Sequence, residues 1–95
     1  MLLENYNKYH NSFIYKIVCL DHNIDDIYIG STVNLNDRCK SHIKACIIKT
    51  YNNYNLKLYK FIRDSGGHDN WKIQVIKEFK CETKRELVKE EQKYI

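Results

Sequence analysis

Residues 13–20, FIYKIVCL, are the part of the chain that decides its fold. Most of their side chains are β-branched or aromatic, which is the composition of a β-strand. A polar connection, DHNIDD at 21–26, leads to a second segment of this kind, IYIGS at 27–31. A connection of this length between two such segments predicts a β-hairpin, so the folded part of the chain is expected to begin with two antiparallel strands.

Two helices are predicted after the hairpin. The first is expected over 34–48, because Asn34 is a suitable N-cap and Asp37 places a negative charge in the first turn. The second is expected over 56–64, where apolar residues recur at helical spacing before the glycine pair at 66–67. Polar residues separate the two helices, which indicates a surface loop between them.

A third strand and a third helix complete the pattern. The segment 71–79, WKIQVIKEF, alternates for much of its length, so Trp71, Ile73 and Val75 are expected on the opposite face from Lys72, Gln74 and Lys77. Thr83 and Glu86 then form a capping box that begins the last helix. The order ββααβα predicts an α+β domain with a small, mainly antiparallel three-stranded sheet flanked by three helices.

Composition limits the domain organisation and the class of protein. The 95 residues suit one domain, with 1–11 as a polar N-terminal extension. The net charge of +4 permits a polyanionic partner without requiring one. The four cysteines show no metal-binding spacing, which favours reduced thiols in an intracellular, reducing compartment. No apolar run is long enough to cross a membrane, so no membrane partner is expected.

The last helix contains an unusual carboxylate. On a helical wheel of 87–95, LVKEEQKYI, the apolar residues Leu87, Val88, Tyr94 and Ile95 share one arc, and Glu91 lies inside it. The same wheel predicts that Glu90 points away from the core. Because a carboxylate on a buried face is costly unless it is paired or binds a metal, Glu91 is the residue that requires an explanation.

Other polar residues fall at positions where their side chains could meet. Arg38 and His42 lie four residues apart on the first predicted helix, and His42 falls within its apolar arc. Tyr15 and Tyr28 lie one on each strand of the hairpin, and Gly30 at a strand end permits close approach of the backbone. Each residue alone fits an ordinary structural role, whereas together with Glu91 they suit cleavage of a phosphodiester.

These residues also resemble the signature of a known family. Phe13-Ile14-Tyr15 and Tyr28-Ile29-Gly30 are similar to the paired motif of the GIY-YIG nuclease superfamily, with Phe13 at the place of the first glycine. Arg38 and His42 resemble the arginine and histidine that follow in the homing-endonuclease branch. The run Glu91-Gln92-Lys93-Tyr94-Ile95 resembles the family's glutamate helix.

The resemblance implies a divalent-metal-dependent endonuclease that hydrolyses DNA to 5′-phosphate and 3′-hydroxyl ends. It implies Tyr15 as general base with help from His42, and Tyr28 as the group that positions water or phosphate. Arg38 would stabilise the charge of the scissile phosphate, and Glu91 would bind Mg²⁺, with Mn²⁺ as a substitute. An unperturbed tyrosine has a pKa near 10, so the tyrosine that acts as base needs a neighbour to take its proton.

Several expectations accompany this interpretation. Residues 12–95 would form the catalytic domain, shortened at its C-terminus, and would act as a monomer or transient dimer. Gly30 and Lys40 are candidate substrate-positioning residues, Lys40 because its charge could contact phosphate. Two alternatives remain: a nucleic-acid-binding module that has the fold but does not cleave, and an interaction domain whose Glu91 pairs with a basic residue of its own core.

Overall fold

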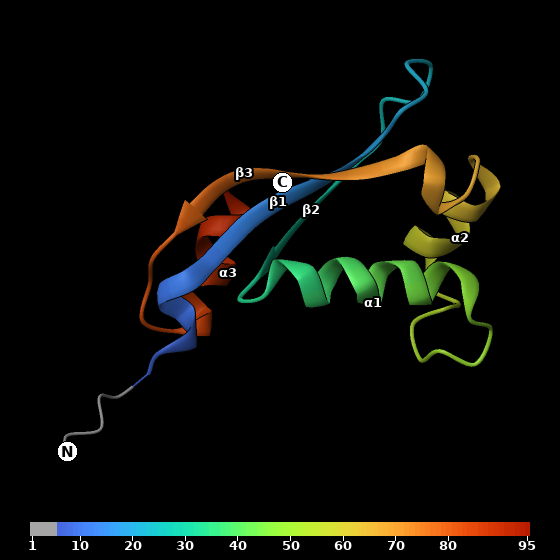
Figure 1. Cartoon of the computed structure of the whole chain (residues 1–95). Helices are drawn as coiled ribbons and strands as arrows, with labels where there is room; N and C mark the ends of the chain where they lie inside the picture. The colour runs from blue at the N-terminus through green and yellow to red at the C-terminus, as the bar shows by residue number, and fades with distance from the viewer. Residues whose placement is uncertain (1–5) are drawn as a thin grey trace.

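The computed structural model describes residues 6–95 and confirms the predicted order of elements (Figure 1). All strand pairs are antiparallel, and β1 lies in the centre of the sheet order β2-β1-β3. The strands are β1 (Ser12–Cys19), β2 (Ile27–Thr32) and β3 (Trp71–Phe79). The helices are α1 (Leu35–Ile47), α2 (Lys57–Asp64) and α3 (Lys84–Gln92), and two short 3-10 helices, η1 (Lys8–Asn11) and η2 (His68–Asn70), precede β1 and β3.

Side-chain caps begin α1 and α3 where the sequence predicts them. The Asn34 side chain accepts a hydrogen bond from the Asp37 N–H at 3.1 Å, and Thr83 accepts one from the Glu86 N–H at 3.3 Å. Beyond the end of α2, Gly67 has φ 79° and donates its N–H to the Ile62 carbonyl at 2.9 Å. These local interactions fix where α1 and α3 begin and where α2 ends.

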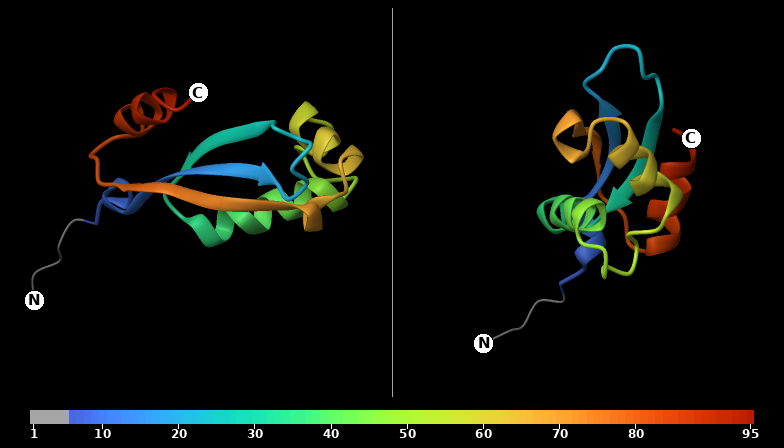
Figure 2. Two further views of the ribbon diagram at one scale, coloured as in Figure 1. Left: turned by 90° about the horizontal axis from the view of Figure 1, so that it is seen from above. Right: turned by 90° about the vertical axis from the view of Figure 1, so that its right-hand side faces the viewer.

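The helices cover both faces of the sheet, as the two views of Figure 2 show. Because side chains alternate along a strand, β1 supplies residues to two separate cores. On one face Tyr15 and Ile17 pack with Ala45 and Cys46 of α1 and with α2 residues. On the other face Ile14 packs with Cys81 and Leu87 beside α3.

The alternation predicted for β3 holds only for part of the strand. A β-bulge interrupts its pairing with β1, because Ile14 pairs with Lys77 whereas Tyr15 pairs with Val75. Ile76 between them has no counterpart and packs in the α3-side core. The bulge returns Lys77 to the face of Lys72 and Gln74, so Trp71, Ile73 and Val75 lie on the opposite face as predicted. Val75 is nevertheless 47% exposed on this outer strand.

The helical wheel of the last helix was wrong in one respect. Glu90 does not point away; it is buried at 7% exposure between Lys77 of β3 at 3.2 Å and Lys93 at 3.0 Å. The α-helix ends at Gln92, so a helical wheel does not describe Tyr94 and Ile95, whose exposed fractions are 38% and 75%. The hydrogen bond from Lys93 lowers the pKa of Glu90, with Lys77 adding to this effect and desolvation opposing it.

Residues 6–11, the described part of the polar N-terminal segment, meet the rest of the chain near the start of α3. Residues 1–5 lie outside the described part. Beyond them, the Asn7 amide donates to the Glu82 carbonyl at 3.0 Å, and the Tyr9 carbonyl accepts the Cys81 N–H at 3.1 Å. Across residues 6–95 the structure contains no helix of the length and apolar character needed to traverse a bilayer.

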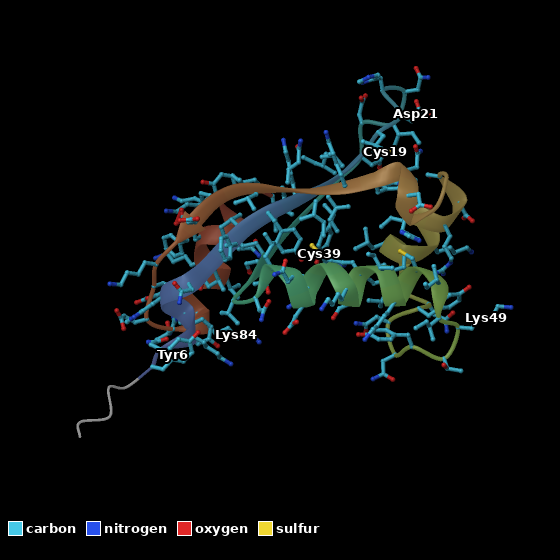
Figure 3. The ribbon with its side chains drawn as sticks, viewed as in Figure 1. Tyr6, Cys19, Asp21, Cys39, Lys49 and Lys84 are labelled. Atoms are coloured by element: carbon cyan, nitrogen blue, oxygen red, sulfur yellow. The ribbon has the colours of Figure 1, made fainter. Side chains whose placement is uncertain are left out.

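The β1–β2 hairpin extends beyond the helices. Its tip, marked by Asp21 in Figure 3, lies away from both cores. The predicted site residues Tyr15, Tyr28 and Gly30 lie below this tip, in the paired part of the hairpin.

Candidate active site

Tyr15 lies at the centre of the candidate site. It occupies the middle of the central strand, and only 1% of its surface is exposed. Its register partner on β2 is Gly30, and Ile17 two residues on pairs with Tyr28. Paired residues of antiparallel strands share a face, so Tyr15, Tyr28 and Gly30 all face α1.

Gly30 is required by space. Its φ lies outside the range that favours glycine, but a Cβ at this position would be 2.5 Å from both Cζ and Oη of Tyr15. The Tyr15 ring therefore lies against the backbone of β2, where any other residue would displace it. The glycine thus fixes where the phenol oxygen is held.

His42 connects two buried phenols. Its Nε2 lies 2.9 Å from Tyr15 Oη, and its Nδ1 lies 2.7 Å from Tyr59 Oη. The histidine side chain reaches the sheet because it is on the inner side of α1, the side on which Cys39 also lies in Figure 3. His42 is 7% exposed and Tyr59 is 6% exposed, so both hydrogen bonds lie within the core.

The sequence did not single out Tyr59 as a site residue. It lies on α2, where Leu58, Tyr59 and Ile62 recur at helical spacing and predict an apolar stripe. The stripe gives the correct location, since Tyr59 belongs to the core with Ile62. A buried tyrosine needs a partner for its hydroxyl, and that requirement was the available signal.

Burial keeps the three connected groups uncharged at neutral pH. Desolvation, with the nearby Arg38 charge, lowers the pKa of His42 to about 4. Desolvation raises the pKa of Tyr59 to about 12 and raises that of Tyr15 as well. Arg38 opposes the rise for Tyr15, whereas Glu91 adds to it, so both charges are close enough to act on this phenol.

Tyr28 and Arg38 form the exposed part of the site. Tyr28 is 41% exposed, and its ring centroid lies 6.4 Å from that of His42 in an edge contact. Arg38 is exposed on the first turns of α1. No carboxylate among residues 6–95 pairs with its guanidinium, so the charge is available to an anion from solution.

Glu91 approaches from the other face of the sheet. Ser31, which follows Gly30 on β2, points to that face and donates its hydroxyl to Glu91 Oε1 at 2.8 Å. No pattern in the sequence identified Ser31 as a partner of Glu91. The strand β2 therefore lies between the carboxylate and the phenol–imidazole cluster.

Glu91 is suited to a hard cation. It is half-buried, and within the described chain its Oε2 accepts no hydrogen bond from a protein group. No cluster of three or more metal-binding side chains occurs in residues 6–95. A single carboxylate with one unused oxygen fits Mg²⁺, which commonly keeps several waters and takes further ligands from substrate phosphate.

The structure thus brings both Tyr15 and Tyr28 into contact with His42. Arg38 and Glu91 lie close enough to influence Tyr15 by their charge, without a direct contact to it. Lys40 is exposed on α1 and has no part in the hydrogen-bonded cluster.

The fold and this cluster define a class: a small α+β domain with acid–base groups, an unpaired arginine and a carboxylate at one edge strand. The sequence model of the GIY-YIG catalytic domain matches residues 4–95, and the chain therefore belongs to the GIY-YIG family. This is a nuclease family, generally dependent on divalent metals, so nucleic acid is the substrate class that the domain implies. Comparisons with curated proteins and with solved structures give no match.

Proposed function

We propose that this chain is a divalent-metal-dependent DNA endonuclease that leaves 5′-phosphate and 3′-hydroxyl ends. The observation that carries the proposal is the hydrogen-bonded pair Tyr15–His42, held under Gly30 and beside the unpaired Arg38 charge. A base, a group to take its proton and a cation for phosphate charge are the protein groups that such hydrolysis needs.

Tyr15 is the proposed general base, with His42 as its proton acceptor. The phenol cannot ionise alone, because burial raises its pKa. Neutral His42 presents Nε2 at 2.9 Å, so the Tyr15 proton can pass to the imidazole as Tyr15 takes the proton of the attacking water. Arg38 favours the negative charge that develops on the Tyr15 oxygen during this proton transfer, since its own positive charge lowers the pKa of Tyr15.

The exposed groups would meet the substrate. Arg38 is proposed to contact a non-bridging phosphate oxygen and to stabilise its charge in the transition state. Tyr28, which is 41% exposed and lies beside the His42 ring, would position the water or the phosphate by its hydroxyl. Lys40, exposed on the same helix as Arg38, is proposed to contact the DNA backbone.

Glu91 would hold the metal ion, Mg²⁺ or Mn²⁺ as its substitute, while Ser31 fixes the orientation of the carboxylate. A bound divalent ion would supply charge stabilisation at the phosphate and the leaving oxygen. Each chain carries one such site, so we propose that double-strand cleavage needs a transient dimer or two successive nicks.

Nicking of supercoiled plasmid tests the proposal. The wild-type chain is expected to nick in Mg²⁺ or Mn²⁺ and not in EDTA, and DNA ligase should reseal the nicks because it needs 5′-phosphate and 3′-hydroxyl ends. Tyr15→Phe, Arg38→Ala and Glu91→Gln should each lower the rate by about a hundredfold or more, as removal of a transition-state contact does. Tyr6→Phe, at a tyrosine that is 79% exposed and remote from the cluster, is the matched control.

Two outcomes would count against it. Salt-sensitive DNA binding without nicking in either metal would identify a binding module that does not cleave. Nicking that is equally fast in Glu91→Gln would show that this carboxylate does not hold the ion.

A further inference from the structure

We infer that Tyr59 is a positioning residue of the site: its phenol oxygen accepts the Nδ1 proton of His42 and so leaves Nε2 unprotonated toward Tyr15. The hydrogen bonds themselves carry this inference, and its catalytic consequence rests on the proposed function. The family signature found in the sequence does not include Tyr59, which lies on α2, outside the segments that carry it.

His42 has two phenol partners and one proton to share between its nitrogens. Nδ1 lies 2.7 Å from Tyr59 Oη, and Nε2 lies 2.9 Å from Tyr15 Oη. A neutral imidazole donates from one nitrogen and accepts at the other. Of the two phenols, therefore, one donates to His42 and the other accepts from it. Which phenol donates depends on which nitrogen of the imidazole carries the proton.

The burial of Tyr15 decides which phenol donates. Tyr15 is 1% exposed, and within the described chain its hydroxyl has no hydrogen-bond partner besides His42. Whichever phenol accepts from His42 keeps an O–H without a protein acceptor within the described chain, and this costs more for Tyr15, at 1% exposure, than for Tyr59, which at 6% is the less buried of the two. Tyr15 must then donate to Nε2, and the imidazole proton lies on Nδ1, where Tyr59 accepts it.

The groups that face His42 are consistent with this state. From β1 and β2 the imidazole meets the phenols of Tyr15 and Tyr28, from α2 that of Tyr59, and from its own helix the Arg38 charge. None of these is an anion that would favour a second proton on the ring. Tyr59 is thus the group that selects which nitrogen of the neutral ring carries its proton.

This role has a catalytic consequence. Tyr15 can release its proton only to an unprotonated Nε2, so the Tyr59 contact prepares the acceptor before substrate arrives. A tyrosine at 59 also holds the ring plane, because His42 is anchored at both nitrogens.

The tautomer can be measured directly in the wild-type chain. Long-range ¹H–¹⁵N spectra of histidine-labelled protein separate protonated from unprotonated ring nitrogens. For His42, assigned by its loss in His42→Gln, the expected pattern at pH 7 is a protonated Nδ1 and an unprotonated Nε2. A protonated Nε2 in the wild-type spectrum would overturn the inference without any variant.

Two phenylalanine variants isolate the hydroxyl contacts. Tyr59→Phe removes the acceptor for Nδ1–H and should shift the tautomer ratio toward Nε2–H by about fivefold, the ratio that the net worth of one hydrogen bond corresponds to. In Tyr15→Phe, the matched control, His42 should keep its proton on Nδ1 because Tyr59, the acceptor of that proton, remains. An unchanged ratio in Tyr59→Phe, with amide dispersion like that of wild type, would also overturn the inference.

Activity supplies a separate measurement. Tyr59→Phe should lower kcat for plasmid nicking by about tenfold with little change in KM, since the phenol acts through His42 and does not touch substrate. An unchanged kcat would remove the positioning role. If wild type does not nick at all while the Nδ1–H tautomer is present, the proposed function fails and the assignment of the tautomer to Tyr59 stands.

Discussion

Replacement of Gly30 by alanine tests whether space for Tyr15 is what this strand position provides. The new Cβ would lie 2.5 Å from Cζ and Oη of Tyr15, about 1 Å inside an ordinary carbon–carbon contact. Tyr15 cannot move aside freely, because it is buried and its hydroxyl is held by His42 at 2.9 Å.

The expected cost follows from these contacts. Overpacking of a filled core costs about 1–3 kcal/mol, and displacement of the Tyr15–His42 hydrogen bond adds about 0.5–1.5 kcal/mol. The reduced freedom of alanine in the unfolded chain offsets about 0.4–1 kcal/mol. The free energy of unfolding should therefore fall by about 2–3 kcal/mol, which corresponds to a decrease in Tm of about 10–20 °C for a domain of this size.

Urea unfolding followed by the fluorescence of Trp71, the single tryptophan, provides the assay. A double-mutant cycle supplies the control: in a Tyr15→Leu background the clash is absent, so Gly30→Ala should cost much less there. The reasoning would be refuted by a Gly30→Ala chain as stable as wild type, or by an equal cost in both backgrounds.

Three further predictions concern charge. Burial and Arg38 lower the pKa of His42 from 6.5 to about 4, so the unfolded chain takes up a proton that the folded chain does not, and stability should be lost as the pH falls through this window. Between pH 7 and pH 4, the free energy of unfolding of wild type should fall by about 2 kcal/mol more than that of His42→Gln, allowing for screening. The same fall in both chains, measured by urea unfolding, would contradict the prediction. Glu90→Gln should lower the urea midpoint at pH 7, with the difference from wild type disappearing in acid, because the lysine contacts that lower the Glu90 pKa stabilise only its charged form. Glu91→Gln should leave the free energy of unfolding within about 0.5 kcal/mol of wild type, and a larger fall than in Glu90→Gln would reverse these roles.

The parts of the fold that rest on local signals could be predicted from sequence. Local residue patterns correctly predict the strand at 13–20, the starts of α1 and α3 at the Asn34 and Thr83 caps, and the end of α2 before its glycines. Tertiary packing agrees with these local preferences. Strand alternation placed Tyr28 and Gly30 on one face, and the structure adds that Tyr15 shares it.

The misplacements have a common cause in long-range contacts. Glu90 is buried because Lys77, thirteen residues away on another element, can meet it, which a helical wheel cannot register. Tyr59 was likewise missed because its partner His42 belongs to a different helix.

The central position of β1 links the site to global stability. Strand β1 is hydrogen-bonded on both sides, and its Ile14 and Tyr15 enter opposite cores. Amide protons that open only when the whole domain unfolds are found in such strands. The phenol of Tyr15 should accordingly be held in place until the domain itself melts, so that the site has no local loosening of its own and thermal inactivation should follow the global unfolding curve.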